Sequence, residues 1–313
     1  MKVRFLKILQ RYAYCGGVFI LLACSVNGNG GEGRAPFQTE AFKEYWYSGK
    51  AELTRYRLEQ ARYGEIHPGE AVLIFVTEDF LPGEQVKYEF GERPADALSA
   101  LKLNFTRRFF TGVYPYNIMT SVFTPVDFSK TGSLKVASSA QEWCGQTYMQ
   151  LNKRGGKFKG VFHSYFQAEA DREFELENAL LEDEIWARIR LNPASLPVGE
   201  IRIIPGTQYL RMSHKPVRVE NAQAALGDSL DPALSPDSIK IYRVRYRELP
   251  RTLTICFEAQ FPYRILAWEE KILDGFRDPK WLATRAVRTH SLVTDYWTKN
   301  SAADSTYRKM LGM

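Results

Sequence analysis

Apolar and polar residues alternate through much of this chain, a spacing typical of β-strands with one buried face. The clearest case is Leu101, Leu103 and Phe105, which are separated by single polar residues. The run at 71–80 is rich in β-branched and aromatic residues and also predicts a strand. The same reasoning predicts further strands at 50–62, 99–110, 113–126, 134–152, 157–166, 199–205, 208–214, 216–226, 239–249, 251–261 and 264–272. A helix is the alternative at 50–62, and 134–152 could hold one strand or two.

One stretch has a different period. In residues 173–191, Leu181, Ile185 and Ile189 recur every four residues, which is the spacing of one face of a helix. Acidic residues crowd the first part of the stretch and arginines its last turn, an order that stabilises both ends of the helix dipole. The spacing therefore predicts one long helix, with Trp186 on its apolar face.

The order of these elements indicates the fold class. Predicted strands follow one another through short turns and do not alternate with helices, which favours a mainly β protein built on an antiparallel sheet. No glycine-rich linker interrupts the sequence after residue 40, so we expect one domain over 41–313. We also expect Trp143, Trp186 and Trp268 to lie mainly in its core.

The N-terminus has the layout of an export signal. Four basic residues precede a short apolar run at 18–23, which is too short to cross a membrane as a helix. The run ends in Leu21-Leu22-Ala23-Cys24, which resembles a bacterial lipobox, whose cysteine receives acyl chains such as palmitate. We expect a signal peptide over 1–23 and a lipidated, flexible tether over 24–40. An ordinary signal peptide that contains a cysteine is the alternative.

Removal of this signal changes the charge of the protein. The full chain has a net charge of +6, whereas the part after residue 23 has 38 basic and 36 acidic residues, a net charge of +2. A high net positive charge would indicate nucleic-acid binding. Most of that indication disappears with the signal, and we expect no nucleic-acid partner.

The stretch 141–146, Gln-Glu-Trp-Cys-Gly-Gln, contains a candidate nucleophile. Cys144 would need a base to form thiolate, and His163 lies across the predicted hairpin. A structural cysteine between packed aromatic residues is the interpretation that we favour. Cys256 is the other cysteine of the predicted domain, and the sequence leaves open whether the two form a disulfide.

Other chemistry has little support. The four histidines include no pair at metal-ligand spacing, the acidic residues at 169–177 lack the spacing of a calcium loop, and no phosphate loop or serine elbow occurs. We therefore predict neither a metal nor a cofactor. Arg243, Arg245 and Arg247 fall on one face of a predicted strand. They could bind phosphate or an acidic glycan, or could form the solvent-exposed face of the sheet.

Several segments together are similar to an uncharacterised family of bacterial envelope lipoproteins, of the Bacteroidota type. They are AFKEYWYSGKAE (41–52), LNFT (103–106), YPYNIM (114–119), QEWCGQ (141–146), HSYF (163–166) and TDYW (294–297). Some members bear the name septum formation inhibitor Maf, but the Ser-x-Ser-Pro-Arg-Arg loop of the Maf pyrophosphatases is missing from this sequence. More weakly, the layout resembles lipoprotein carriers, which implies a curved sheet or half-barrel with about one long helix packed on it.

These patterns lead to one functional hypothesis and one alternative. We expect a lipid-anchored protein of the cell envelope, at the outer membrane, that serves without catalysis as a binding or structural module for a lipid, a glycan or an envelope partner. The alternative is an envelope hydrolase that uses paired carboxylates or Cys144 and His163.

The lipid anchor can be tested directly. Replacement of Cys24 by Ala removes the only sulfur to which the signal would direct a lipid, so the variant should leave the membrane fraction. Cell fractionation followed by immunoblotting measures this. A variant that stays in the membrane pellet as the wild type does would contradict the lipobox interpretation.

Overall fold

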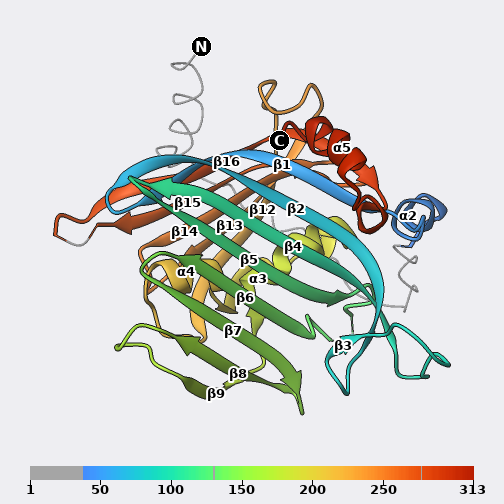
Figure 1. Cartoon of the computed structure of the whole chain (residues 1–313), viewed down its shortest axis with the longest axis horizontal. Coiled ribbons are helices and arrows are strands. Elements are labelled where there is room, and N and C mark those ends of the chain that lie inside the picture. Colours follow the sequence, from blue (N-terminus) through green and yellow to red (C-terminus); the bar gives the residue numbers. More distant parts are fainter. Residues whose placement is uncertain (1–37, 130, 276) are drawn as a thin grey trace, which may run out of the picture. The chain divides into compact units, whose positions relative to one another are not determined.

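The computed structural model describes residues 38–129, 131–275 and 277–313, which form one compact unit. Strands account for 54% and helices for 14% of the chain, and one large curved sheet of 16 strands contains all the strands. Figure 1 shows α3 and α4 within the curve of this sheet. The predicted fold class, a mainly β protein with a curved antiparallel sheet and a packed helix, is confirmed. Among the described residues, no helix combines the length and the apolar character that crossing a membrane requires.

The first half of the unit consists of one short helix and nine strands. These elements are α2 (Glu40–Trp46), β1 (Ala51–Arg62), β2 (Glu65–Leu81), β3 (Val86–Lys87), β4 (Leu98–Thr111), β5 (Tyr114–Pro125), β6 (Lys135–Glu142), β7 (Gly145–Arg154), β8 (Lys157–Ser164) and β9 (Arg172–Glu177).

The second half contains the helices that pack on the sheet. Its elements are β10 (Leu180–Leu181), α3 (Glu182–Leu191), β11 (Gly199–Ile204), α4 (Thr207–Met212), β12 (Glu220–Ser229), β13 (Ile239–Tyr246), β14 (Arg251–Glu258), β15 (Ile265–Asp274), β16 (Lys280–Thr294) and α5 (Ser305–Met310). Short 3-10 turns lie at Pro193–Ser195, Tyr296–Thr298 and Ala302–Asp304.

The sheet follows the order of the sequence almost everywhere. From β1 it runs through β2 and β4 to β9 on one side, and from β16 back to β11 and β10 on the other. All the pairs are antiparallel except β10 with β11. The two ends of the sheet, β9 and β10, are joined only by residues 178–179, and an ion pair between Glu177 and Arg202 links β9 to β11. We call this junction the seam.

The core lies between the sheet and α3. Trp186 of α3 and Trp268 of β15 are 3% and 2% exposed, and their ring centroids are 5.2 Å apart. Both tryptophans are core residues, as predicted. The prediction was wrong for Trp143, which is 70% exposed because it lies in the turn between β6 and β7.

Two element predictions also need correction. The helix begins at Glu182, and residues 172–177 form strand β9, in which acidic residues alternate with the half-buried Phe174 and Leu176. That alternation is the period of a strand, and the charges also protect a sheet edge from further pairing. Residues 207–212, expected in a strand, form α4, because all six of them are buried against the sheet and α3 rather than on one face. The predicted charge order of α3 is confirmed, with acidic residues first and arginines last.

Buried ion pairs hold α3 in the curve of the sheet. Arg251 of β14 contacts Glu182 at the start of the helix and Glu270 of β15, with 2.9 Å between Arg251 Nη1 and Glu270 Oε2. Glu270 also pairs with Arg107 of β4, and these four side chains are all buried. The two arginines hold the pKa of Glu270 at about 2, in spite of its burial. Removal of one partner from such a group commonly costs ~3–5 kcal/mol, because the other charge stays buried.

A fifth buried group lies next to this network. Asp183 accepts a hydrogen bond from the backbone N–H of Thr207, with 3.0 Å between N and Oδ2. Burial raises the pKa of Asp183 to about 7 from an ordinary value of 3.8, with Glu182 adding to the effect and Thr207 and Arg251 opposing it. The folded state therefore binds a proton at this carboxyl that the unfolded chain releases.

The core position of Trp186 predicts a large loss of folding stability when its side chain is truncated. Trp186→Ala should destabilise the protein by about 3–5 kcal/mol, because it removes a buried indole and leaves a cavity. Trp143→Ala is the matched control and should change stability by no more than about 0.5 kcal/mol, since its ring is exposed. Denaturant unfolding measures both. Equal losses in the two variants would contradict this assignment of core and surface.

The raised pKa of Asp183 predicts a difference in stability between the wild type and Asp183→Asn that depends on pH. Because its pKa is higher in the folded state, its favourable contribution is present below pH 3.8 and is lost as the pH rises through about 7. Asp183→Asn cannot ionise and should melt at a higher temperature than the wild type at about pH 8, while the difference disappears at about pH 4. A difference in Tm that stays the same across this range would show that Asp183 is not protonated in the fold.

Candidate binding cleft

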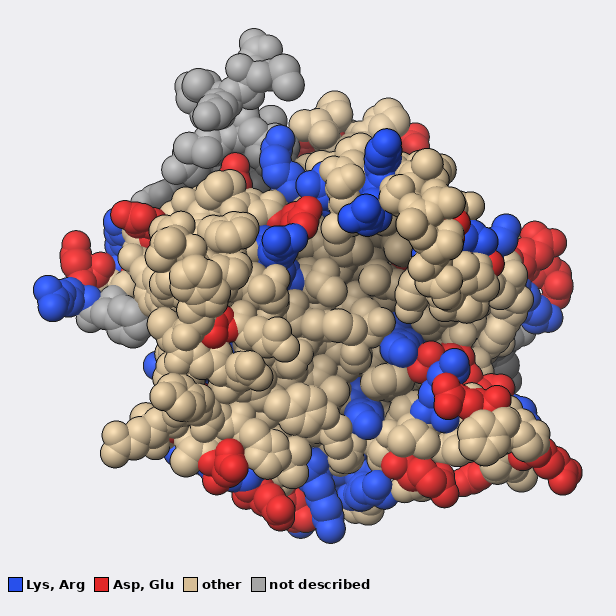
Figure 2. All heavy atoms as spheres, in the orientation of Figure 1, with Lys and Arg blue, Asp and Glu red and all other residues tan. Residues whose placement is uncertain are grey.

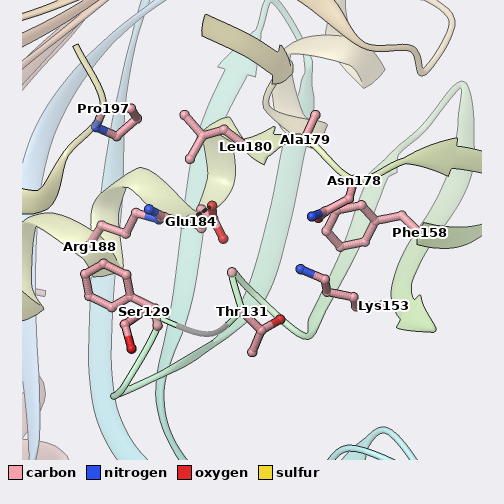
Figure 3. Close-up of a pocket in the computed structure, with 12 residues that line it drawn as sticks. Ser129, Thr131, Lys153, Phe158, Asn178, Ala179, Leu180, Glu184, Arg188 and Pro197 are labelled. Atoms are coloured by element: carbon pink, nitrogen blue, oxygen red, sulfur yellow. Dashed lines mark ion pairs between the residues drawn. The ribbon is translucent and has the colours of Figure 1, made fainter. Parts of the chain in front are cut away.

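A cleft of about 380 Å³ opens beside the seam. The loop between β5 and β6, the facing strands β7 and β8, the β9–β10 connection and α3 all contribute to its wall. In Figure 3 the Lys153 and Asn178 side chains extend into this space from one side, and Glu184 and Arg188 lie on the helix across from them. The cleft thus gathers residues that are up to 69 positions apart in sequence, from Phe128 to Pro197.

Glu184 is the carboxylate among the described lining residues, and it already has partners. Its Oε2 accepts the backbone N–H of Ser133 at 2.5 Å, and its Oε1 lies 2.8 Å from Arg188 Nη2. Gly132 makes this approach possible, since a Cβ at that position would lie 2.9 Å from Glu184 Oε2. The carboxylate therefore anchors the β5–β6 loop to α3.

Two cations face the same space. The Arg188 guanidinium lies 4.9 Å from the centroid of the Phe128 ring, and its Nε atom is buried without a hydrogen-bond partner among the described residues. Lys153 Nζ lies 5.7 Å from the centroid of Phe158. Burial lowers the pKa of Lys153, while Glu184 acts to raise it and Arg188 to lower it. With two cations and one carboxylate, the described lining carries an excess of one positive charge.

This arrangement suits one anionic group. A phosphate or carboxylate can accept hydrogen bonds from Lys153 and Arg188, and the hydroxyls and amide of Ser129, Thr131 and Asn178 offer further polar contacts. The rings of Phe128 and Phe158 supply apolar surface for the rest of a ligand. The Ser129 hydroxyl donates a hydrogen bond to the Asp127 carboxylate, with 2.5 Å between Oγ and Oδ1, and the described lining residues include no histidine or cysteine.

The structure places Cys144 and His163 apart. Cys144 is exposed in the β6–β7 turn, and His163 on β8 lies opposite Tyr148, four positions further along β7. His163 Nδ1 lies 3.3 Å from the Asp171 carboxylate. Neither residue lines the cleft.

Both described cysteines are free thiols. Cys256 is buried on β14, and burial raises its pKa to about 12. Cys144 lies in an exposed turn, so the disulfide that the sequence left open does not form in this structure. Cys24, the predicted lipidation site, lies outside the described residues, as do the signal and most of the tether.

The arginine stripe lies on the outer face of the sheet. Arg243, Arg245 and Arg247 are exposed, and the residues that alternate with them are buried. Arg247 pairs with Glu200, and Arg243 Nε lies 3.5 Å from the hydroxyl of Thr254. In the part of the chain that the structure describes, no cluster of three or more His, Cys, Asp or Glu side chains could hold a metal ion.

Comparison of the chain with protein-family models, with curated proteins and with solved structures finds no match. The class of the protein, a curved-sheet protein with a cationic cleft at its seam, therefore follows from its own geometry. Sequence reasoning missed Lys153 and Arg188. Arg188 is one of the arginines at the end of the predicted helix, and no local pattern in the sequence connects it to Lys153 on β7.

Proposed function

We propose that this chain is a lipid-anchored protein of the bacterial cell envelope, at the outer membrane, that binds an anionic envelope ligand and catalyses no reaction. On this proposal it belongs with the envelope lipoproteins that its sequence resembles. The ligand is an anionic group of a glycan or of a lipid headgroup, because both carry phosphates or carboxylates. A membrane tether would keep the cleft at a high local concentration of such groups.

The observation that carries the proposal is the charge of the cleft. Lys153 forms no ion pair with the described residues, whereas the one lining carboxylate, Glu184, is held by Ser133 and Arg188. A hydrolase acting here would need a free carboxylate pair or an activated nucleophile. The geometry therefore favours binding of an anion over hydrolysis.

Lys153 is the residue to change first, since its loss disturbs no ion pair. Lys153→Gln should weaken binding of glycerol phosphate, or of galacturonate, by about tenfold or more, because a hydrogen bond to a charged group contributes ~1.5–3 kcal/mol. Titration calorimetry measures the affinity for both probes. Preference for the phosphate would indicate a headgroup or phosphorylated glycan, and preference for galacturonate an acidic glycan.

Lys159→Gln is the matched control, because Lys159 is exposed on the neighbouring strand β8 and does not line the cleft. The affinity of this variant for both probes should equal that of the wild type.

Because the pKa of Lys153 is lowered, binding of the anionic probes should weaken with rising pH at a lower pH than it would with an ordinary lysine. Failure of both probes to bind, or equal losses in the two variants, would contradict the proposal.

A further inference from the structure

The β6–β7 turn lies at the ends of these two strands that are away from the cleft, and it carries a second group of candidate binding side chains. Trp143 projects from the β6–β7 turn with 70% of its surface exposed, next to Tyr114 at the start of β5. The two rings lie 6.4 Å apart between centroids, with an angle of 27° between their planes. The exposed Trp143 indole is thus supported by a second, stacked ring, and we call this pair the platform.

A chain of tyrosine hydroxyls leads from the platform into the protein. Tyr114 donates to the hydroxyl of Tyr63 at 3.2 Å, and the hydroxyls of Tyr63 and Tyr116 are 2.6 Å apart. Beneath them, Arg62 Nη2 lies 3.3 Å from both of these oxygens. The Arg62 guanidinium is buried and also lies 4.2 Å from the centroid of the Tyr63 ring. The hydroxyl chain is thus held in place by a fixed positive charge.

The inner end of this chain contains polar atoms that the protein leaves without partners. Arg211 of α4 pairs with Glu142, the last residue of β6, and both are buried. Tyr116 also hydrogen-bonds Glu142, whereas Arg211 Nε and Nη1 have no hydrogen-bond partner among the described residues. Burial and then Glu142 raise the pKa of Tyr116, which keeps its hydroxyl protonated. Buried polar atoms in native proteins are mostly hydrogen-bonded, so these two nitrogens are donors that an ordered water could satisfy.

Packing around the β6–β7 turn fixes the position of the platform. A Cβ on Gly145 would lie 3.0 Å from Tyr165 Cδ1, a tight contact, so glycine favours close packing of the loop after β8 against this turn. Phe166 of that loop packs on the Arg211 guanidinium, whose Cζ atom lies 4.7 Å from the centroid of the Phe166 ring. The loop after β8 therefore contacts both the turn that carries the platform and the buried Arg211–Glu142 pair.

We propose that this end of the sheet is a saccharide-binding site, separate from the cleft. A pyranose ring presents a flat apolar face that stacks on an exposed indole, and hydroxyls at its edge that hydrogen-bond to tyrosine hydroxyls. The platform supplies the first contact and Tyr114 the second. The buried Arg211–Glu142 pair extends the polar network inward from Tyr116. A turn that only inserts into a bilayer needs apolar side chains and no such network.

The test uses the full-length protein on an array of immobilised glycans, followed by titration calorimetry with the best-bound soluble oligosaccharide. We expect binding to at least one glycan family. Trp143→Ala should weaken it by about tenfold, because the stacked ring is lost. Tyr114→Phe keeps the platform and loses the outer hydroxyl, so it should weaken binding by a smaller factor. Binding is scored on neutral glycans only, because the cationic cleft would take an acidic one, and this separates the two sites.

Trp297→Ala is the matched control. Trp297 is also exposed, at 47%, but it meets its neighbour Tyr296 edge-on with an angle of 76° between the rings. It should bind saccharide as the wild type does. Failure to bind any glycan on the array, or equal binding by Trp143→Ala and the wild type, would overturn the proposal. So would Trp143-dependent flotation with phosphatidylcholine vesicles in place of glycan binding, since that result would define a bilayer-inserting turn.

Discussion

The fold depends on a helix that carries charges into the interior of a curved sheet. Arg251 lies between Glu182 of α3 and Glu270 of β15, and Glu270 also meets Arg107 of β4. A sheet could close around apolar side chains in many registers, whereas buried charges accept only the arrangement that pairs each of them. This network therefore specifies where α3 lies, and α3 in turn forms one wall of the cleft.

The strands could be predicted from the sequence because their information is local. Alternation at Leu101, Leu103 and Phe105 corresponds to buried positions of β4, and the outward arginines of β13 followed the same rule. Prediction failed for α4 and for β9. The six residues of α4 are buried all round, so they show no amphipathic period, and β9 is a polar edge strand next to a true helix. In both cases tertiary packing decided the local structure.

Neither candidate site could be read from the sequence, for a different reason. Lys153 and Arg188 belong to β7 and α3 and meet only because the sheet curves until its two ends adjoin. Trp143 was expected in the core because its stretch resembles a strand, yet a tight turn between β6 and β7 exposes it. The neighbouring Cys144 attracted a catalytic hypothesis, whereas the structure directs attention to the indole beside it and to the tyrosines of adjacent strands.

The seam also has a consequence for chain connectivity. Ala51 pairs with Thr294, so the first and last long strands are neighbours, and their pairing closes a loop of more than 200 residues at a substantial entropic cost. If the chain were joined between its present ends and opened at residues 178–179, the order of strands along the polypeptide would become identical to their order in the sheet. Such a circular permutant would retain every ladder while replacing its most distant pairing by a local one. The native connectivity therefore places the slowest-forming contact at the centre of the sheet and leaves the sheet's free edges next to each other in sequence.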